Sequence, residues 1–189
     1  MRPLLVVAGI LAGCAAGPMD SGTTMNAQDY MPPIPAGART ETVRRIALQP
    51  NGGSSGLTFS GFHTQVRQVV QDEATWKAVW QQIFAGRVPQ PPIEPVDFSK
   101  ETVLLASMGD CSNSGFSISI DGAFADASGT TAAVSSTTPD PMCMGGMMTM
   151  QVITQPLDVV AIPKASAVTF AERGTMTMCA GGMPMGMDR

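Results

Sequence analysis

Residues 102–108 read Thr-Val-Leu-Leu-Ala-Ser-Met and form a continuous apolar run. A strand that is covered on both faces carries apolar residues at successive positions, whereas a strand with one solvated face alternates apolar with polar residues. The run therefore predicts a central strand, and we expect the rest of the folded part to be built around it.

The residues that follow this run predict further strands separated by turns. Phe116, Ile118 and Ile120 alternate with polar residues, as expected of a strand with one buried face. Gly122 together with residues 126–129 is expected to separate this strand from a second one at 131–137, and Pro139-Asp140-Pro141 to break the chain. Three more strand candidates follow, at 148–154, 158–163 and 167–171.

A helix is predicted upstream of the central run, over about residues 73–85. Asp72 can accept hydrogen bonds from the exposed amides of its first turn, and Gly86 can end it before the prolines between 89 and 95. Four apolar residues stand at i, i+3, i+4 and i+7, which places them on one face. A tryptophan pair at this spacing is more typical of a core anchor than of a ligand platform. The predicted core residues of this face are Trp76, Val79, Trp80 and Ile83.

The folded part is expected to begin near residue 41 and to end near residue 173. Residues 42–48 alternate apolar and polar, a Pro-Asn-Gly-Gly turn follows at 50–53, and residues 56–62 continue, which predicts a β-hairpin. Residues 65–70 predict another strand. One helix among seven or more strands is typical of an α+β domain, either a mainly antiparallel sheet or a sandwich with the helix packed on it.

Residues 1–14 are typical of a bacterial export signal. Arg2 supplies a positive charge, residues 4–11 are almost entirely apolar, and Leu11-Ala12-Gly13-Cys14 closes the stretch. This tetrad resembles the lipobox of bacterial lipoproteins, in which the peptide is cleaved before a lipidated cysteine; an ordinary secretory signal is the alternative. We therefore expect residues 1–13 to be a signal peptide and Cys14 to carry a lipid anchor.

The lipid anchor predicts where the protein resides. Residues 14–40 contain Gly, Pro, Ser, Asn and Met with little apolar periodicity and are expected to be a flexible tether between the anchor and the domain. Ala15 follows the cysteine, where an Asp would favour retention in the inner membrane. The predicted location is the cell envelope, and in a bacterium with two membranes the outer membrane, facing the periplasm or the cell surface.

Composition and motifs exclude several classes of protein. Charged residues make up 14% of the chain and the formal net charge is −4, so there is no basic footprint for a nucleic acid. A single histidine, His63, excludes most multi-histidine metal sites. The sequence contains no GxSxG, GxGxxG, Walker A, HExxH or CxxC motif.

Six segments, in order along the chain, resemble the PrcB C-terminal domain family over roughly residues 64–163. The apolar run of 102–108, preceded by Val96-Asp97-Phe98-Ser99-Lys100 and followed by a Gly-aromatic strand, is the most distinctive part. The segments are Asp72-Glu73-x-x-Trp76-x-x-x-Trp80, residues 96–100, the run ending at Met108-Gly109, Ser114-Gly115-Phe116-Ser117-Ile118-Ser119-Ile120, residues 139–143 and residues 151–162.

The resemblance implies an accessory role. The family is named for a lipoprotein subunit of a surface protease complex, and it is associated with stabilising the protease without being the peptidase. We therefore expect a module without catalysis of its own and without a cofactor, which binds or stabilises a partner protein, with an envelope protease as the implied partner. Two features depart from the family pattern: Ser114-Gly115-Phe116 replaces a Gly-Gly-Tyr-like turn, and the Met-rich cysteine segments are additional.

Structural roles are expected for the polar residues near the central run. Phe98 is predicted to fill the core, while Asp97 or Ser99 satisfies backbone amides at the entrance of the strand. Ser112 and Ser114 beside Asp110 are conceivable nucleophiles, but an activated serine needs a positioned base and no motif links His63 to them. A hydrolase is therefore not expected.

The cysteines predict one disulfide. Lipidation of Cys14 leaves Cys111, Cys143 and Cys179, an odd number, in an oxidising compartment. Cys111 with Cys143 is the first choice, because both lie in loops beside strands within the resemblance. Cys179 is then a free thiol or an alternative partner of Cys143.

Two Met-Cys-x-Gly-Gly-Met segments support a second hypothesis. Ten of the fifteen methionines fall within 142–150 and 176–187, the latter inside a predicted tail, residues 174–189. Thioethers and thiolates are soft donors that suit Cu(I), so a periplasmic Cu(I)-binding lipoprotein is the alternative function. A second interpretation is that Met147–Met150 partly fill the core while the C-terminal repeat is a tail that binds no ligand. A third is that the exposed methionines are oxidised in place of other groups or form a surface for a partner. The copper ligands would be Met142, Cys143, Met144, Met147, Met176, Met178, Cys179 and Met183.

Overall fold

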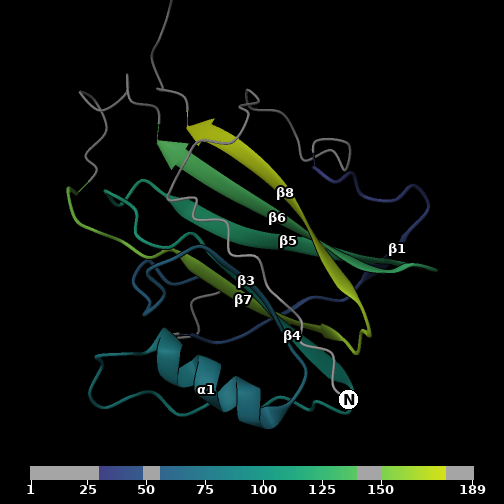
Figure 1. The fold of residues 1–189 in the computed structure, drawn as a ribbon, viewed down its shortest axis with the longest axis horizontal. Helices are drawn as coiled ribbons and strands as arrows, with labels where there is room; N and C mark the ends of the chain where they lie inside the picture. The colour runs from purple at the N-terminus through teal and green to yellow at the C-terminus, as the bar shows by residue number, and fades with distance from the viewer. Residues whose placement is uncertain (1–29, 49–55, 140–149, 178–189) are drawn as a thin grey trace, which may run out of the picture.

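The computed structural model describes residues 30–48, 56–139 and 150–177, which form two β-sheets and a helix (Figure 1). This is an α+β fold dominated by strands. The elements are β1 (Arg39–Glu41), β2 (Arg44–Arg45), β3 (Val66–Val70), α1 (Glu73–Ile83), β4 (Glu101–Ser107), β5 (Ser117–Asp126), β6 (Gly129–Pro139), β7 (Leu157–Pro163) and β8 (Val168–Thr177).

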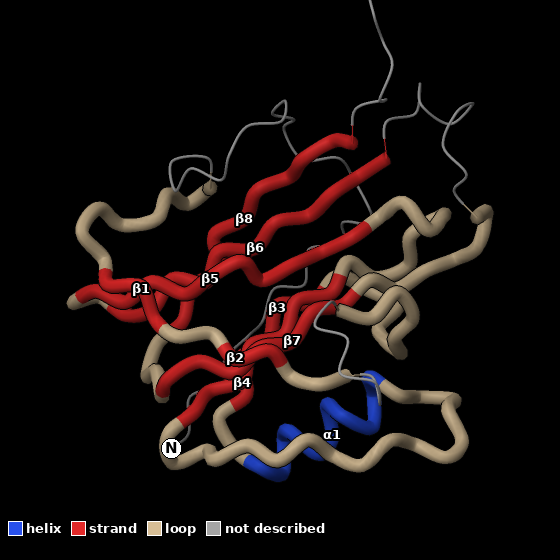
Figure 2. The backbone as a smooth tube through the Cα atoms, turned by 180° about the vertical axis from the view of Figure 1, so that it is seen from behind, coloured by secondary structure: helices blue, strands red, loops and turns tan. Residues whose placement is uncertain are grey.

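The strands divide into two four-stranded sheets. The mixed sheet has the order β1-β5-β6-β8, in which β6 and β8 are parallel and the other neighbours antiparallel. The antiparallel sheet has the order β2-β7-β4-β3. Seen from behind, the antiparallel sheet lies between the mixed sheet and α1 (Figure 2). No helix in the described ranges is both long and apolar enough to cross a bilayer.

The predicted central strand is confirmed as β4, which pairs with β3 on one side and β7 on the other. Its alternate side chains enter two different hydrophobic clusters. Val103 and Leu105 pack with the helix, whereas Leu104 and Ala106 pack in a cluster shared with the mixed sheet. Both faces of the strand are covered, which is the physical reason for the unbroken apolar run.

The helix α1 forms where its sequence predicts. The Asp72 carboxylate accepts a hydrogen bond from the Thr75 backbone N–H at 2.8 Å, and Gly86 adopts a φ of +80° just beyond the helix. The helix ends at Ile83, two residues earlier than expected. Its buried side chains are Trp76, Val79, Trp80 and Ile83, the face that the spacing indicates.

The predicted hairpin of residues 42–48 and 56–62 is wrong, because both segments pair with the strand β7. Arg44 stands opposite Ala161, whereas Leu57 forms an isolated antiparallel bridge with Leu157, with N···O distances of 2.8 and 2.9 Å. Local alternation indicates one buried face for each segment, but it does not identify the neighbouring strand.

Two further strand predictions need correction. Gly122 does not interrupt β5, which continues to Asp126 with a register shift between Ile120 and Gly122. Residues 150–154 form no strand; only Thr154 makes an isolated bridge, to Cys111, and residues 148 and 149 lie outside the described part. The backbone of this segment instead bonds to the segment around Cys111 and Ser114.

The folded part extends beyond both expected boundaries. Tyr30 has an exposed fraction of 4%, so the segment before residue 41 already packs on the domain. At the other end β8 continues to Thr177, four residues beyond the expected boundary at 173, because it pairs with β6 along its full length. Strand pairing with a distant partner determines these limits, and composition does not reveal it.

Two arginine–carboxylate pairs join the sheets at opposite edges. Arg67 of β3 donates two hydrogen bonds to the Glu172 carboxylate of β8, at 2.8 and 3.0 Å. On the other side Arg45 of β2 pairs with Asp158 of β7, and the same carboxylate accepts from the backbone N–H of Ile120 in β5 at 2.7 Å. The first pair thus joins the sheets directly, and the second does so through the hydrogen bond from Ile120 to Asp158.

Candidate partner-binding surface

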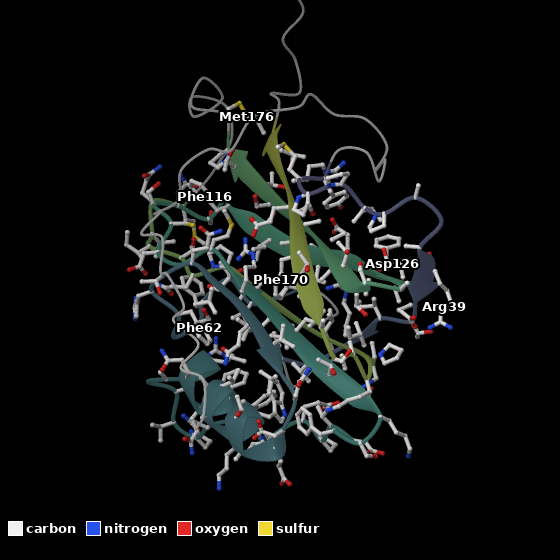
Figure 3. The ribbon with its side chains drawn as sticks, turned by 45° about the vertical axis from the view of Figure 1, so that its right-hand side comes forward. Arg39, Phe62, Phe116, Asp126, Phe170 and Met176 are labelled. Carbon is white, nitrogen blue, oxygen red and sulfur yellow. The ribbon has the colours of Figure 1, made fainter. Side chains whose placement is uncertain are left out.

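Three loops meet at one end of the sheets, and we call them the three-loop end: residues 56–63, 109–116 and 150–157. The second loop leaves β4 and enters β5, and the third enters β7. Phe62 and Phe116 mark this end in Figure 3, opposite Arg39 and Asp126 at the other end of the sheets. The backbone of the neighbouring strands therefore determines where the loops lie.

Backbone hydrogen bonds hold the three loops together. Cys111 and Thr154 exchange two N–H···O bonds of 2.8 and 2.9 Å, and the Gln155 amide donates to the Thr58 carbonyl at 2.8 Å. Ser114 contacts Met150 twice: its amide donates to the Met150 carbonyl at 3.1 Å, and its hydroxyl accepts from the Met150 amide at 3.0 Å. The loops thus present one hydrogen-bonded surface.

Exposed apolar side chains are the feature of this end that indicates binding. The exposed fractions are 44% for Phe59, 65% for Met150 and 56% for Ile153. Large apolar side chains that a rigid backbone holds in solvent are common at protein–protein interfaces. These three side chains make the three-loop end a candidate contact surface.

A polar cluster borders the same loops. The His63 Nδ1 atom lies 3.0 Å from Asp110 Oδ1, and Gln155 Nε2 donates to that oxygen at 2.7 Å. The hydrogen bond from Gln155, and then the one from His63, lower the pKa of Asp110 below its usual value. The carboxylate therefore stays charged and fixes the first loop to the other two.

The serines of the second loop have structural partners. The Ser114 hydroxyl accepts from the Met150 amide, and the Ser112 hydroxyl accepts from the Asn113 side chain at 3.5 Å. Within the described ranges neither hydroxyl is hydrogen-bonded to His63, whose Nδ1 faces Asp110. His63 is thus paired with the Asp110 carboxylate, and neither Ser112 nor Ser114 is positioned beside it as a nucleophile.

Gly109 explains the Met-Gly pair at the end of the central strand. Its φ is +76°, and a Cβ atom there would lie 2.7 Å from the carbonyl carbon of Thr64 and 2.9 Å from the Gln65 nitrogen. Only a glycine allows β4 to turn so closely against the loop that precedes β3. The motif therefore has a backbone role at this end of the molecule.

Two hollows of the surface lie near these elements. One, of about 190 Å³, opens at the three-loop end between the starts of β5 and β7. The other, of about 330 Å³, lies between the first turns of α1 and the connection to β4. The first is lined by Gly56, Leu57, Thr58, Phe116, Ser117, Ile118, Pro156 and Leu157.

Several predicted site residues lie in the described part. Cys111 is disulfide-bonded and 1% exposed; its pairing with Cys143 stays a prediction, since Cys143 lies outside the described residues. Phe98 is half-buried and packs against the helix-side cluster. Met176 lies in β8 opposite Thr138 of β6. The predicted residues outside the described part are Cys14, Met142, Cys143, Met144, Met147, Met178, Cys179 and Met183.

The polar residues near the central strand stabilise its entrance. The Asp97 carboxylate accepts from the Ser99 hydroxyl and amide and from Lys100 Nζ, the last at 2.9 Å. These bonds, with the Ser99 hydroxyl first, lower the pKa of Asp97 to about 2. Within the described ranges no group of three or more His, Cys, Asp or Glu side chains is placed to hold a metal ion.

Two features of this end were not predicted from the sequence. Gln155 joins the polar cluster, although nothing in its local sequence distinguishes it. Asp158 lies within the apolar stretch 157–162, and a carboxylate at such a position is the one feature that indicates a buried charged partner.

Comparisons with known proteins find one family model that is similar to part of the chain. Residues 102–163 match the sequence model of the family described as PrcB C-terminal. The match spans β4 to β7 and covers 62 of the 189 residues, so the expected resemblance is confirmed over this segment. No curated protein and no solved structure matches the chain.

Proposed function

We propose, from the match of residues 102–163 to the PrcB C-terminal family, that the chain is an accessory module that binds or stabilises an envelope protease. The three-loop end is the proposed contact surface. The observation that carries this assignment is the exposure of Met150 and Ile153 on the third loop, which lies inside the matched segment.

The construction of the surface supports binding. Binding to a preformed surface costs less conformational entropy than binding to a mobile loop. The backbone bonds between Cys111 and Thr154 hold two of the loops in place. Apolar side chains surrounded by polar groups such as Asp110 are the usual anatomy of a protein interface. The family thus suggests the partner, and the loops provide a surface for it.

The proposed role involves no catalysis and no cofactor. The hydroxyl of Ser114 and the carboxylate of Asp110 are both engaged in joining loops. A serine that accepts a backbone amide in this way has a structural use for its oxygen. These contacts favour an accessory protein over a hydrolase.

The proposed location follows from residues 1–14. Cys14 would carry the lipid, with the signal peptide removed, and the domain would stand in the cell envelope on the outer membrane of a bacterium with two membranes. We also propose that the sheets pack as a sandwich, since Leu104 of β4 and Ile120 of β5 belong to one buried cluster.

Turnover of envelope peptidases tests the proposed function. Cells without this protein should lose one envelope peptidase faster than cells that contain it, and the wild-type chain should restore its lifetime. An Ile153→Glu variant should not restore it, because a charge on the apolar surface opposes contact. Quantitative mass spectrometry of the envelope after synthesis is stopped gives the half-lives.

Val88→Glu is the matched control, since Val88 is 95% exposed and lies in the connection after α1. It adds the same charge outside the three-loop end and should restore the full lifetime of the peptidase. Equal peptidase lifetimes with and without the protein would contradict the proposed function.

Cu(I) binding is the second candidate, and one observation favours it. The parallel pairing of β6 with β8 places Pro139 opposite Thr177, and adjacent strands lie about 4.8 Å apart. The segments 142–147 and 178–183 therefore begin within a few residues of one point on the sheet. Sulfur donors from both could reach a single ion.

Anaerobic titration of the reduced protein with Cu(I) against a competing chelator tests this candidate. Binding of a defined number of ions, lost in the double variant Met178→Ala and Cys179→Ala, would support the copper function. An affinity below that of the chelator would contradict it. A thiol count on the untreated protein shows whether Cys143 is available as a ligand.

A further inference from the structure

The segment from Tyr30 to Ala38, which precedes β1, lies on the mixed sheet, and we call it the strap. Met31 and Glu172 of β8 exchange two backbone hydrogen bonds, with N···O distances of 3.0 and 3.1 Å. This is one antiparallel bridge at the outer edge of β8. The strap then continues to β1, which pairs with β5 at the far side of the same sheet.

The Tyr30 side chain fills a niche on the outer face of the mixed sheet. Two small residues, Ala133 of β6 and Ala171 of β8, leave room for its ring and pack with it. The hydroxyl donates to the Asp121 carboxylate at 2.5 Å, and the Arg173 guanidinium lies over the ring, 5.4 Å from its centre. The ring is buried although it belongs to a segment without regular structure.

Tyr30 is the one fully buried residue of the strap. Met31 is 73% exposed, and the residues that follow it are exposed or half-buried. Gly37 has nothing within 4 Å of the position a Cβ would take. The Tyr30 ring, the partly buried Ile34 that packs against the same cluster, and the single bridge thus hold the strap, whereas the buried clusters of β4 and β7 contain none of its residues.

We propose that the strap is a releasable clamp, in which Tyr30 fastens the N-terminal leader to the mixed sheet and stores a length of tether. The attachment of the strap by Tyr30 does not depend on the proposed lipid anchor. The stored length of tether does depend on it. With Tyr30 in place, fifteen residues separate Cys14 from Tyr30, and the chain between them spans at most about 55 Å. Release extends the free chain to Arg39, twenty-five residues beyond Cys14, and a span of at most about 85 Å.

The clamp therefore sets how far the three-loop end can reach from a bilayer. A tether of fixed length limits the partners that the domain can contact, and a longer tether reaches more distant ones. Because Tyr30 is the one fully buried side chain of the strap, a single substitution there should open the clamp. The domain itself should stay folded.

Hydrogen exchange of the full chain tests the clamp. In Tyr30→Ala the amides of Met31 and Glu172 should exchange at least about tenfold faster, because both belong to the bridge, while the amides of β4 keep their protection. Tyr30→Phe is the matched variant: it keeps the ring and removes only the bond to Asp121. It should therefore accelerate the same two amides by a smaller factor.

Two results would overturn the proposal. Unchanged exchange of the Met31 and Glu172 amides in both variants would show that Tyr30 does not hold the strap. Faster exchange of the β4 amides together with these two would show that the strap is part of the core. Should Tyr30→Ala fail to fold, Tyr30→Phe decides between these outcomes.

Neutron reflectometry on the lipidated protein in a supported phosphatidylethanolamine and phosphatidylglycerol bilayer tests the consequence. The Tyr30→Ala layer should stand farther from the bilayer than the wild-type layer. An equal distance from the bilayer for the two layers would show that the strap stores no length of tether. Failure of the wild-type protein to stay on the bilayer would contradict the lipid anchor and leave the exchange result standing.

Discussion

Asp158 is a carboxylate in an otherwise apolar strand, and it satisfies groups from three strands. Its side chain is 4% exposed and accepts from Arg45 of β2, from the Ile120 amide of β5 and from the Val159 amide of its own strand. Arg45 in turn donates to the Ile120 carbonyl at 3.2 Å. The β1 strand ends at Glu41 opposite Ala123, so Ile120 needs these side-chain partners.

Asp158→Ala should destabilise the domain by about 1–3 kcal/mol, because it leaves the Ile120 amide without an acceptor and removes a charge-assisted bond. Asp158→Asn retains an acceptor and should lose less. Urea unfolding of the variants measures both. Asp126→Asn, at the exposed end of β5, is the control for Asp158→Asn, and equal losses at the two positions would contradict the role given to Asp158.

Gly109→Ala should destabilise the domain more than Gly86→Ala does. Both glycines have a positive φ, +76° and +80°, so both substitutions carry a backbone cost of about 1–2 kcal/mol. At Gly109 the new Cβ would also meet the backbone of Thr64, whereas nothing lies within 4 Å at Gly86. Chemical unfolding of the two variants gives the difference; equal losses would show that the loop before β3 yields to the methyl group.

Asp97 predicts a pH dependence at acid pH. Its pKa of about 2 in the folded protein lies below the ordinary 3.8, so its stabilising effect is complete above about pH 4 and is lost as the pH falls towards 2. The melting temperature of the wild type should exceed that of Asp97→Ala at pH 5, and the two should converge near pH 2. A constant difference across this range would contradict the assignment.

The helix α1 is anchored by its tryptophan pair. The ring centres of Trp76 and Trp80 lie 5.3 Å apart at an angle of 69°, and both indole N–H groups donate to carbonyls of the connection to β4. These bonds, to Glu94 and Pro91, fix the proline-rich connection against the helix. The pair therefore stabilises two segments at once.

Trp76→Ala should destabilise the domain by about 3–5 kcal/mol, since it removes a fully buried ring and opens a cavity beside β4. Thermal and urea unfolding measure the loss. Lys77→Ala, on the exposed side of the same helix, should have little effect. An unchanged unfolding curve for Trp76→Ala would contradict the packing of the helix face.

Elements whose own residues carry the pattern could be predicted, and elements that depend on distant pairing could not. The central run and the Trp76–Ile83 face each contain their full signal within a few residues, and β4 and α1 form there. Residues 42–48 and 56–62 both alternate apolar with polar side chains. Their shared neighbour, β7, lies about a hundred residues further along the chain. Likewise β8 continues past residue 173 because β6 pairs with it.

The candidate site was predictable only in part. The Met108-Gly109 pair and Ser114-Gly115-Phe116 indicate the second loop because they resemble the family pattern. Cys111 lies between these two motifs, which places it in the same loop. The third loop was expected to be a strand, and its hydrogen bonds to residues 57–58 depend on how the whole chain folds. Gln155 and Ile153 therefore enter the site without a local signal.

At the scale of the whole molecule, the layers assign different roles to different faces. The helix packs on one side of the antiparallel sheet, a buried cluster on its other side is shared with the mixed sheet, and residues 30–38 lie on the opposite face of the mixed sheet. The three-loop end projects from one end of these layers (Figure 3). It combines a rigid backbone with exposed apolar groups, which is the basis of the proposed contact with a protease.

Site-specific photocrosslinking in living cells tests this central claim most directly. A photoreactive amino acid at Ile153, in the three-loop end, should form a covalent product with an envelope peptidase that mass spectrometry identifies, whereas the same group at the exposed Val88 should not. A peptidase product from position 153 alone is the predicted result. The same products from both positions, or no peptidase from either, would contradict the account.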